Sequence, residues 1–234
     1  MDYLFEITVK KIFLLHIIFL FSVLQAQELK NFVTPKGYKK LVETKGDLDK
    51  DGKEEIIIVF NSTKKVKSFY DRESPQRELF ILKKINGKLK IWKKYSTIIF
   101  PQEIGFSPES DPLPEISIKK GALNITQSFS TNSRHRMTYK HTYRFQDDDF
   151  YLIGSLQNFD DNCEFNMYDE INFSTGKAIV DQKYYPCFPE DKKAPAEDFH
   201  KEFYYKTKKL VKMNNFKPGE NLIKIPNSDK HLQY

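Results

Sequence analysis

Alternating apolar and polar residues along the middle of the chain predict a succession of β-hairpins. Short segments of this kind lie in pairs, and each pair is separated by a dipeptide that favours a tight turn. The pairs are 79–82 with 89–92 around Asn86-Gly87, 116–118 with 123–125 around Lys120-Gly121, 137–145 with 150–154 around Asp147-Asp148, and 171–173 with 178–180 around Thr175-Gly176. Hairpins in sequence predict a mainly β fold, an antiparallel meander.

The segment 137–145 has the clearest period of two. Met137, Tyr139, His141, Tyr143 and Phe145 fall on one face of a strand, and Thr138, Lys140, Thr142 and Arg144 fall on the other. Because neighbouring side chains of a strand point to opposite faces, we expect the first set to lie in the core.

The C-terminal third has a weaker pattern. Phe199, Phe203, Leu210 and Val211 fall at nearly helical spacing, which favours a short helix within 196–213. A strand at 203–205 is the competing interpretation. We expect residues 229–234 to be a frayed tail.

The N-terminus has the layout of a secretory signal. Lys10 and Lys11 precede an apolar run over 12–23, and Leu24-Gln25-Ala26 offers a cleavage site. We therefore expect a signal peptide at 1–26, a single β-rich domain at 27–228 and an exported protein, periplasmic or extracellular. A retained single-helix anchor is the alternative.

The net charge of +6 changes this picture little. The charged residues of the signal cancel, and the basic excess consists mostly of isolated lysines among acids. A dispersed excess is typical of a solvated surface, so nucleic acid is not expected as a partner. The apolar run of the signal is too short for a comfortable membrane span, so no stable span is expected after signal cleavage.

The segment Asp47-Leu48-Asp49-Lys50-Asp51-Gly52-Lys53-Glu54-Glu55 is the strongest candidate for chemistry, and it leads directly into the apolar run 56–60. Alternating acidic residues repel one another unless a cation lies between them, and calcium takes carboxylate and carbonyl oxygens from such a turn. The predicted ligands are the carboxylates of Asp47, Asp49, Asp51 and Glu55 and the backbone carbonyl of Lys53. Ile58 stands where an EF-hand has its bidentate Glu, so Glu55 must replace it. A solvated Asp/Gly turn without metal is the alternative.

This loop, Gly46 to Glu55, resembles the calcium loop of FG-GAP and VCBS-type repeats. Together with Tyr143-Arg144-Phe145-Gln146, Phe150-Tyr151-Leu152-Ile153-Gly154 and 171–177, the chain resembles uncharacterised exported bacterial proteins that carry one such loop. The resemblance implies a secreted, β-rich, calcium-loop protein and no particular activity.

Cys163 and Cys187 are the two cysteines of the chain. In an exported protein a lone pair most simply forms one disulfide.

Other candidates have weaker patterns. His135 and His141 share a strand face beside several arginines, which suggests either an anion or acid/base site or, more simply, a core histidine with surface arginines. The acidic runs 147–149 and 160–161 suggest a second calcium site or solvated turns. The sequence contains no Gly-x-Ser-x-Gly, His-Glu-x-x-His or Cys-x-x-Cys motif.

The function predicted from these patterns is an exported, calcium-stabilised binding or structural module that binds a protein or a glycan. The alternatives are a hydrolase of unrecognised class, which a deep pocket joining a histidine to a carboxylate would favour, and an inhibitor or immunity-type protein.

Overall fold

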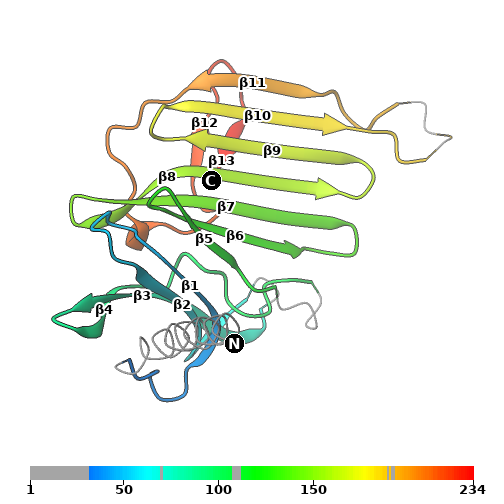
Figure 1. Ribbon diagram of the computed structural model, residues 1–234. Coiled ribbons are helices and arrows are strands. Elements are labelled where there is room, and N and C mark those ends of the chain that lie inside the picture. Colours follow the sequence, from blue (N-terminus) through cyan, green and yellow to red (C-terminus); the bar gives the residue numbers. More distant parts are fainter. Residues whose placement is uncertain (1–31, 69–70, 107–111, 189, 191–192) are drawn as a thin grey trace, which may run out of the picture.

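The computed structural model describes residues 32–68, 71–106, 112–188, 190 and 193–234. Within these ranges the fold is mainly β, and neighbouring strands are antiparallel (Figure 1). The predicted signal segment 1–26 lies outside the described residues. No helix in the described part of the chain is both long enough and apolar enough to cross a membrane.

The N-terminal half forms a four-stranded sheet in the simple order β1-β2-β3-β4. Its strands are β1 (Lys39–Gly46), β2 (Glu55–Lys67), β3 (Glu73–Ile85) and β4 (Lys88–Tyr95). Strand β2 is buried on both faces from Glu55 to Ser62.

The remaining strands form a seven-stranded sheet in the order β11-β10-β9-β8-β7-β6-β5, and a small C-terminal pair. The large sheet consists of β5 (Glu115–Lys119), β6 (Ala122–Ser130), β7 (His135–Gln146), β8 (Asp149–Asp161), β9 (Phe165–Asn172), β10 (Lys177–Tyr184) and β11 (Phe199–Tyr204). The pair β12 (Leu222–Lys224) and β13 (His231–Gln233) follows the 3₁₀ helix η1 (Met213–Asn215) and lies behind the large sheet in Figure 1.

The predicted hairpins are confirmed. The turn residues Asn86 and Gly87 have φ values of 51° and 75°, and Asp147 and Asp148 have 47° and 59°. Left-handed conformation at both central residues defines the type I′ turn, whose twist matches that of the flanking strands. These short connections explain why strands adjacent in sequence are adjacent in the sheets.

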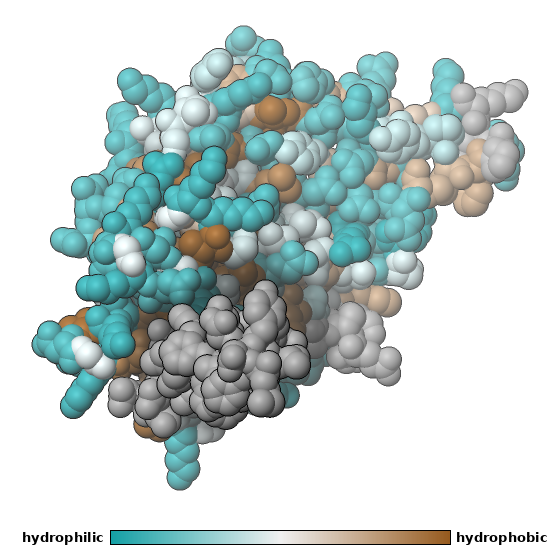
Figure 2. Space-filling model, in the orientation of Figure 1, coloured by the Kyte–Doolittle hydropathy of each residue, from teal (hydrophilic) through white to brown (hydrophobic). Residues whose placement is uncertain are grey.

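One continuous core joins the four-stranded sheet, the seven-stranded sheet and the C-terminal segment. It contains Ile57 and Leu79 from the small sheet, Tyr143 and Leu152 from the large sheet, and Phe216 from the C-terminal segment. The predicted inward face of β7 is confirmed, since Tyr139, His141 and Tyr143 are buried. The opposite face of the large sheet, turned toward the viewer in Figure 2, carries mainly hydrophilic residues.

The prediction of a short helix within 196–213 is wrong. Residues 199–204 form strand β11, which pairs with β10 and sets Phe203 opposite Ala178. Phe199 and Phe203 are four residues apart, a spacing that fits one face of a helix and one face of a strand equally well. Pairing with the exposed edge of β10 decided between them.

The tail predicted to fray is ordered instead. Strand β13 pairs with β12, and Leu232 and Tyr234 are buried in the core. The ring of Tyr234 stacks against Phe216, with centroids 6.2 Å apart. A tail with apolar groups to bury is held in place by that packing.

Candidate functional site

The acidic loop connects β1 to β2 at one end of the small sheet. Leu48, between the first two aspartates, is buried and anchors the loop in the core. Gly46 lies so close to β5 that a Cβ there would meet the Ile118 side chain at 3.0 Å. A Cβ on Gly121, at the β5–β6 turn, would meet Lys50 of the loop at 2.8 Å. The loop therefore lies where the two sheets meet.

Side chains of the loop hold its backbone in a tight turn. Asp47 Oδ2 accepts a hydrogen bond of 3.1 Å from the amide of Gly52, and Asp49 Oδ1 accepts one of 3.3 Å from that of Asp51. Lys50 and Gly52 have φ values of 64° and 82°. The left-handed backbone at Gly52 is the conformation for which glycine is favoured. The turn directs the aspartates to one side.

Glu55 closes the loop from inside the protein. Its side chain is fully buried, and Glu55 Oε2 accepts a hydrogen bond of 2.9 Å from the amide of Leu48. Burial raises the pKa of the Glu55 carboxyl, and the nearby Asp49 carboxylate adds to that effect.

Three carboxylates converge on one point. One oxygen each of Asp47, Asp49 and Glu55 lies within 4.8 Å of the others. A calcium ion holds its oxygens at about 2.3–2.6 Å, so oxygens at this separation can contact one ion together. Asp47 Oδ1 and Glu55 Oε1 are buried and have no hydrogen-bond partner among the described residues. Buried acceptors in this state are well suited to a cation.

Lys83 of β3 brings an ammonium group into the same cluster. Its Nζ donates to Asp49 Oδ2, lies 2.9 Å from Asp51 Oδ2 and lies 3.6 Å from Glu55 Oε1. Although desolvation opposes it, hydrogen bonding to Asp49 and Asp51 raises the pKa of Lys83, and the same ammonium lowers the pKa of Asp51. The group is therefore charged.

The pattern of the loop gives no sign of Lys83. The signal that could have found it is the register of β2 on β3, in which Ile56 is opposite Leu82. Continuing that antiparallel register by one residue sets Lys83 opposite Glu55.

Trp92 of β4 lies beside this ammonium. The Lys83 Nζ is 5.0 Å from the centroid of the indole, within the range of a cation–π contact. The indole packs in turn on Phe145 and Phe150, at centroid distances of 4.6 and 5.7 Å. Trp92 is the single tryptophan of the chain.

The structure brings Asp47, Asp49 and Glu55 together and joins Asp51 to them through Lys83. Lys53 donates its amide to Asp51 Oδ1 at 2.9 Å. A metal ligand at its carbonyl stays a prediction.

The acidic run 147–149 is engaged with lysines. Asp149 Oδ2 lies 3.0 Å from Lys212 Nζ, and the Asp148 carbonyl accepts a hydrogen bond of 2.7 Å from Lys93. Although partial burial opposes it, the hydrogen bond from Lys212 lowers the pKa of Asp149. These contacts are explained more simply by a hairpin turn that two lysines hold in place than by a second metal site.

Asp161, from the other acidic run, ties the end of β8 to β7. Asp161 Oδ1 accepts hydrogen bonds of 2.8 Å from Arg134 and from the amides of Cys163 and Glu164. The Arg134 guanidinium is the main cause of the low pKa of this carboxyl. The disulfide between Cys163 and Cys187, predicted from the sequence, lies in the same corner, with Cα atoms 5.0 Å apart.

His135 completes this corner. Its Nε2 lies 2.9 Å from Asp161 Oδ2, and its Nδ1 lies 2.9 Å from Asn132 Nδ2. Because the Asn132 amide nitrogen can only donate, Nδ1 accepts this hydrogen bond, and Nε2 faces the Asp161 carboxylate. Each ring nitrogen thus lies beside a polar side chain.

His141 is separate from His135 and fully buried. Its ring packs against Phe216 at 4.8 Å, and neither ring nitrogen has a hydrogen-bond partner among the described residues. Burial lowers the pKa of His141 to about 3, so the ring is neutral. The core interpretation of this residue fits, although the hydrogen bond usual for a buried histidine is not made within the described chain.

An apolar cavity of about 610 Å³ opens on the inner face of the large sheet. Phe129, Met137, Tyr139 and Phe159 of β6, β7 and β8 form its floor, and the 100–104 loop and the 218–220 turn form its walls. Its one carboxylate, Glu220, is exposed and lies 3.2 Å from Lys217 Nζ. The cavity therefore fits a neutral, largely apolar group.

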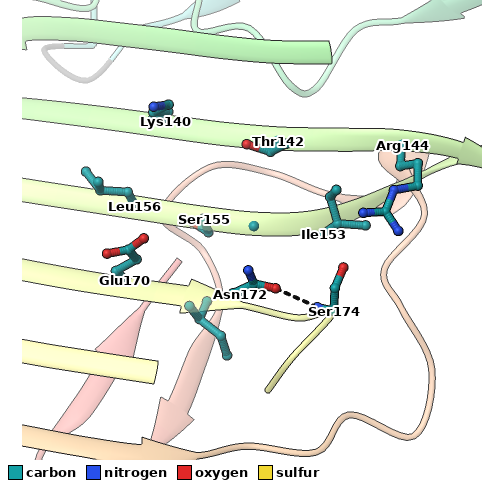
Figure 3. A pocket seen from close by; sticks show the side chains of 11 residues that line it. Lys140, Thr142, Arg144, Ile153, Ser155, Leu156, Glu170, Asn172 and Ser174 are labelled. Atoms are coloured by element: carbon teal, nitrogen blue, oxygen red, sulfur yellow. Dashed lines mark hydrogen bonds between the residues drawn. The ribbon is translucent and has the colours of Figure 1, made fainter. Parts of the chain in front are cut away.

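The opposite face of the same sheet carries a smaller polar basin of about 230 Å³, drawn in Figure 3. Lys140 and Arg144 of β7 and Glu170 and Asn172 of β9 line it, and Asn172 Oδ1 accepts a 3.0 Å hydrogen bond from the amide of Ser174. It is smaller and no aromatic ring lines it, so the apolar cavity is the better candidate for ligand binding.

Comparisons with protein-family models, with curated proteins and with solved structures found no match.

Proposed function

We propose that the protein is an exported binding module whose acidic loop holds a calcium ion. The observation that carries the calcium proposal is the convergence of Asp47, Asp49 and the buried Glu55, with two carboxylate oxygens that have no hydrogen-bond partner in the described chain. An ion at that point would link the end of β1 to the start of β2, in the loop that packs beside the β5–β6 turn. Its role is to stabilise the junction of the two sheets.

The binding role is supported by the aromatic cavity. Its volume is within the usual range of ligand sites, about 300–1,000 Å³, and its lining is mostly apolar. Phe100, Phe129 and Tyr139 form a cluster in which the ring centroids are 5.2–6.3 Å apart. A neutral apolar group of a partner protein, or a small apolar molecule, fits this lining better than a glycan, which needs more free polar groups.

The hydrolase has less support. The described lining of the aromatic cavity contains no histidine, and its one carboxylate, Glu220, is exposed and lies beside Lys217. His141 is buried and neutral. The disulfide is compatible with export, since such bonds persist in oxidising compartments.

Calorimetric titration with calcium tests the proposal. We expect one site with a dissociation constant of about 10⁻⁴ to 10⁻³ M, because the bidentate Glu of a tight loop is absent. The double variant Asp49→Ala, Asp51→Ala should lose binding. As a control, Asp147→Asn, Asp148→Asn removes two carboxylates while keeping residues that tolerate the left-handed turn, and it should bind as the wild type does. Binding retained by the first variant would contradict the proposed site.

A further inference from the structure

We propose that Lys83 is a tethered competitor of calcium, whose ammonium occupies the ion's position when the loop is metal-free and must leave when calcium binds. This inference rests on the proposed calcium site and concerns how that site is regulated. It makes the loop a two-state element in which one of two cations is always present.

The contacts of Lys83 support mutual exclusion. Its Nζ donates to Asp49 and lies 3.6 Å from Glu55 Oε1, and these two residues belong to the group whose oxygens converge. An ion bound to both carboxylates would lie within a few ångströms of the ammonium. Two like charges at that distance in a largely buried site repel strongly.

The charge of the cluster explains why calcium can still displace the Lys83 ammonium. Asp47, Asp49, Asp51 and Glu55 offer as many as four negative charges, and Lys83 supplies one positive charge among them. A divalent ion neutralises more of this charge than an ammonium does, and it can also use Asp47 Oδ1 and Glu55 Oε1. The ammonium, however, is covalently held and never diffuses away, so it lowers the apparent affinity of the ion at any concentration.

The side chain of Lys83 has room to withdraw from the carboxylates. It is 18% exposed, and its Nζ already lies 5.0 Å from the centroid of the Trp92 ring, at the border of the cluster. Withdrawal from the carboxylates would move the charge along or away from the indole face. Trp92 should therefore report the exchange through its fluorescence.

The first test compares calcium titrations of Lys83→Met and Lys84→Met with the wild type. Methionine keeps the apolar stem and removes the charge. Lys84, the next residue of β3, is exposed, so it controls for the loss of one positive charge from the same strand. We expect affinity to rise by about tenfold or more in Lys83→Met, because the repulsion and the competitor are both removed. Lys84→Met should bind as the wild type does.

A second measurement needs no variant. Mild acetylation of the wild-type protein, read residue by residue by mass spectrometry, should label Lys83 faster with saturating calcium than without it, and Lys84 at the same rate in both. Over the same titration Trp92 emission should change with one midpoint.

The outcomes separate the two proposals. Equal calcium affinity in the wild type and Lys83→Met, or calcium-independent labelling of Lys83, would overturn the competition while leaving the site intact. If none of the three proteins binds calcium, the proposed site itself fails. If Lys83→Met folds only with calcium present, the ammonium is replacing the ion as proposed.

Discussion

His141 shows how a buried polar residue sets a pH limit on this fold. Its neutral ring packs among Tyr139, Tyr143 and Phe216, and burial lowers its pKa to about 3. An unfolded histidine titrates near about 6.5, so the unfolded chain takes up a proton that the folded chain refuses. The contribution of His141 to stability is therefore present above about pH 6.5 and is lost progressively as pH falls toward 3.

Replacing His141 separates its volume from its charge. Phenylalanine fills similar space without buried polar atoms, so His141→Phe should be as stable as the wild type at pH 7, within about 1 kcal/mol. As pH falls toward 4, the free energy of unfolding of His141→Phe should exceed that of the wild type by a growing margin. Alanine leaves a cavity and should cost about 1–3 kcal/mol. Urea unfolding at several pH values measures the free energy of unfolding of the wild type, His141→Phe and His141→Ala.

Arg144 provides the contrast on the other face of β7. It is exposed at the polar basin, so Arg144→Ala should change the free energy of unfolding by no more than about 0.5 kcal/mol. A large loss for Arg144→Ala combined with none for His141→Ala would overturn the face assignment.

At the scale of elements, the hairpins were predictable because their turns carry local signals. Asn86-Gly87 and Asp147-Asp148 adopt left-handed conformations that only a few residue types favour, and the flanking alternation sets which faces are buried. At β11 a helix was preferred to the competing strand because the spacing of Phe199 and Phe203 satisfies both periods. The choice depended on the free edge of β10, a non-local fact.

The candidate site was predictable only in part for the same reason. The acidic loop is local, and Asp47, Asp49 and Glu55 could be selected from spacing alone. Lys83 enters through strand pairing across the β2–β3 hairpin, so its presence depends on a register that the loop sequence does not encode. The cavity depends on three separate segments and had no sequence signal.

The disulfide is the clearest test at this scale. Cys163 follows β8 and Cys187 follows β10, so the bond closes the β9–β10 hairpin at its open end. Replacing both cysteines by serine should lower the free energy of unfolding by about 3 kcal/mol through the loss of loop closure in the unfolded chain. Thermal or urea unfolding under oxidising conditions measures it, and reduction of the wild type should give the same loss. An unchanged stability would show that the bond adds no constraint.

For the whole molecule, two separate segments cover the inner face of the large sheet around Tyr139, beyond the part on which the four-stranded sheet packs. The 96–106 loop covers one part and the C-terminal segment the other, and the aromatic cavity lies where both approach Tyr139. At the edge of the cavity, Gly219 lies so close to Tyr139 that a Cβ on this glycine would meet Tyr139 Oη at 2.7 Å. The cavity is thus a consequence of how the chain closes over one sheet.

A neutral fluorescent probe, N-phenyl-1-naphthylamine, tests whether this cavity accepts apolar ligands. Emission should rise on mixing with the folded protein. Met137→Trp places a larger side chain on the cavity floor and should reduce that signal, while Arg144→Ala on the opposite face should not. Equal probe binding in both variants would place the apolar site elsewhere.

The calcium site is tested most directly by a crystal structure grown with millimolar calcium and measured for anomalous scattering. We predict one calcium peak in contact with Asp47, Asp49 and Glu55, with the Lys83 ammonium withdrawn from these carboxylates. A loop without such a peak at saturating calcium, with Lys83 Nζ still among the carboxylates, would contradict it.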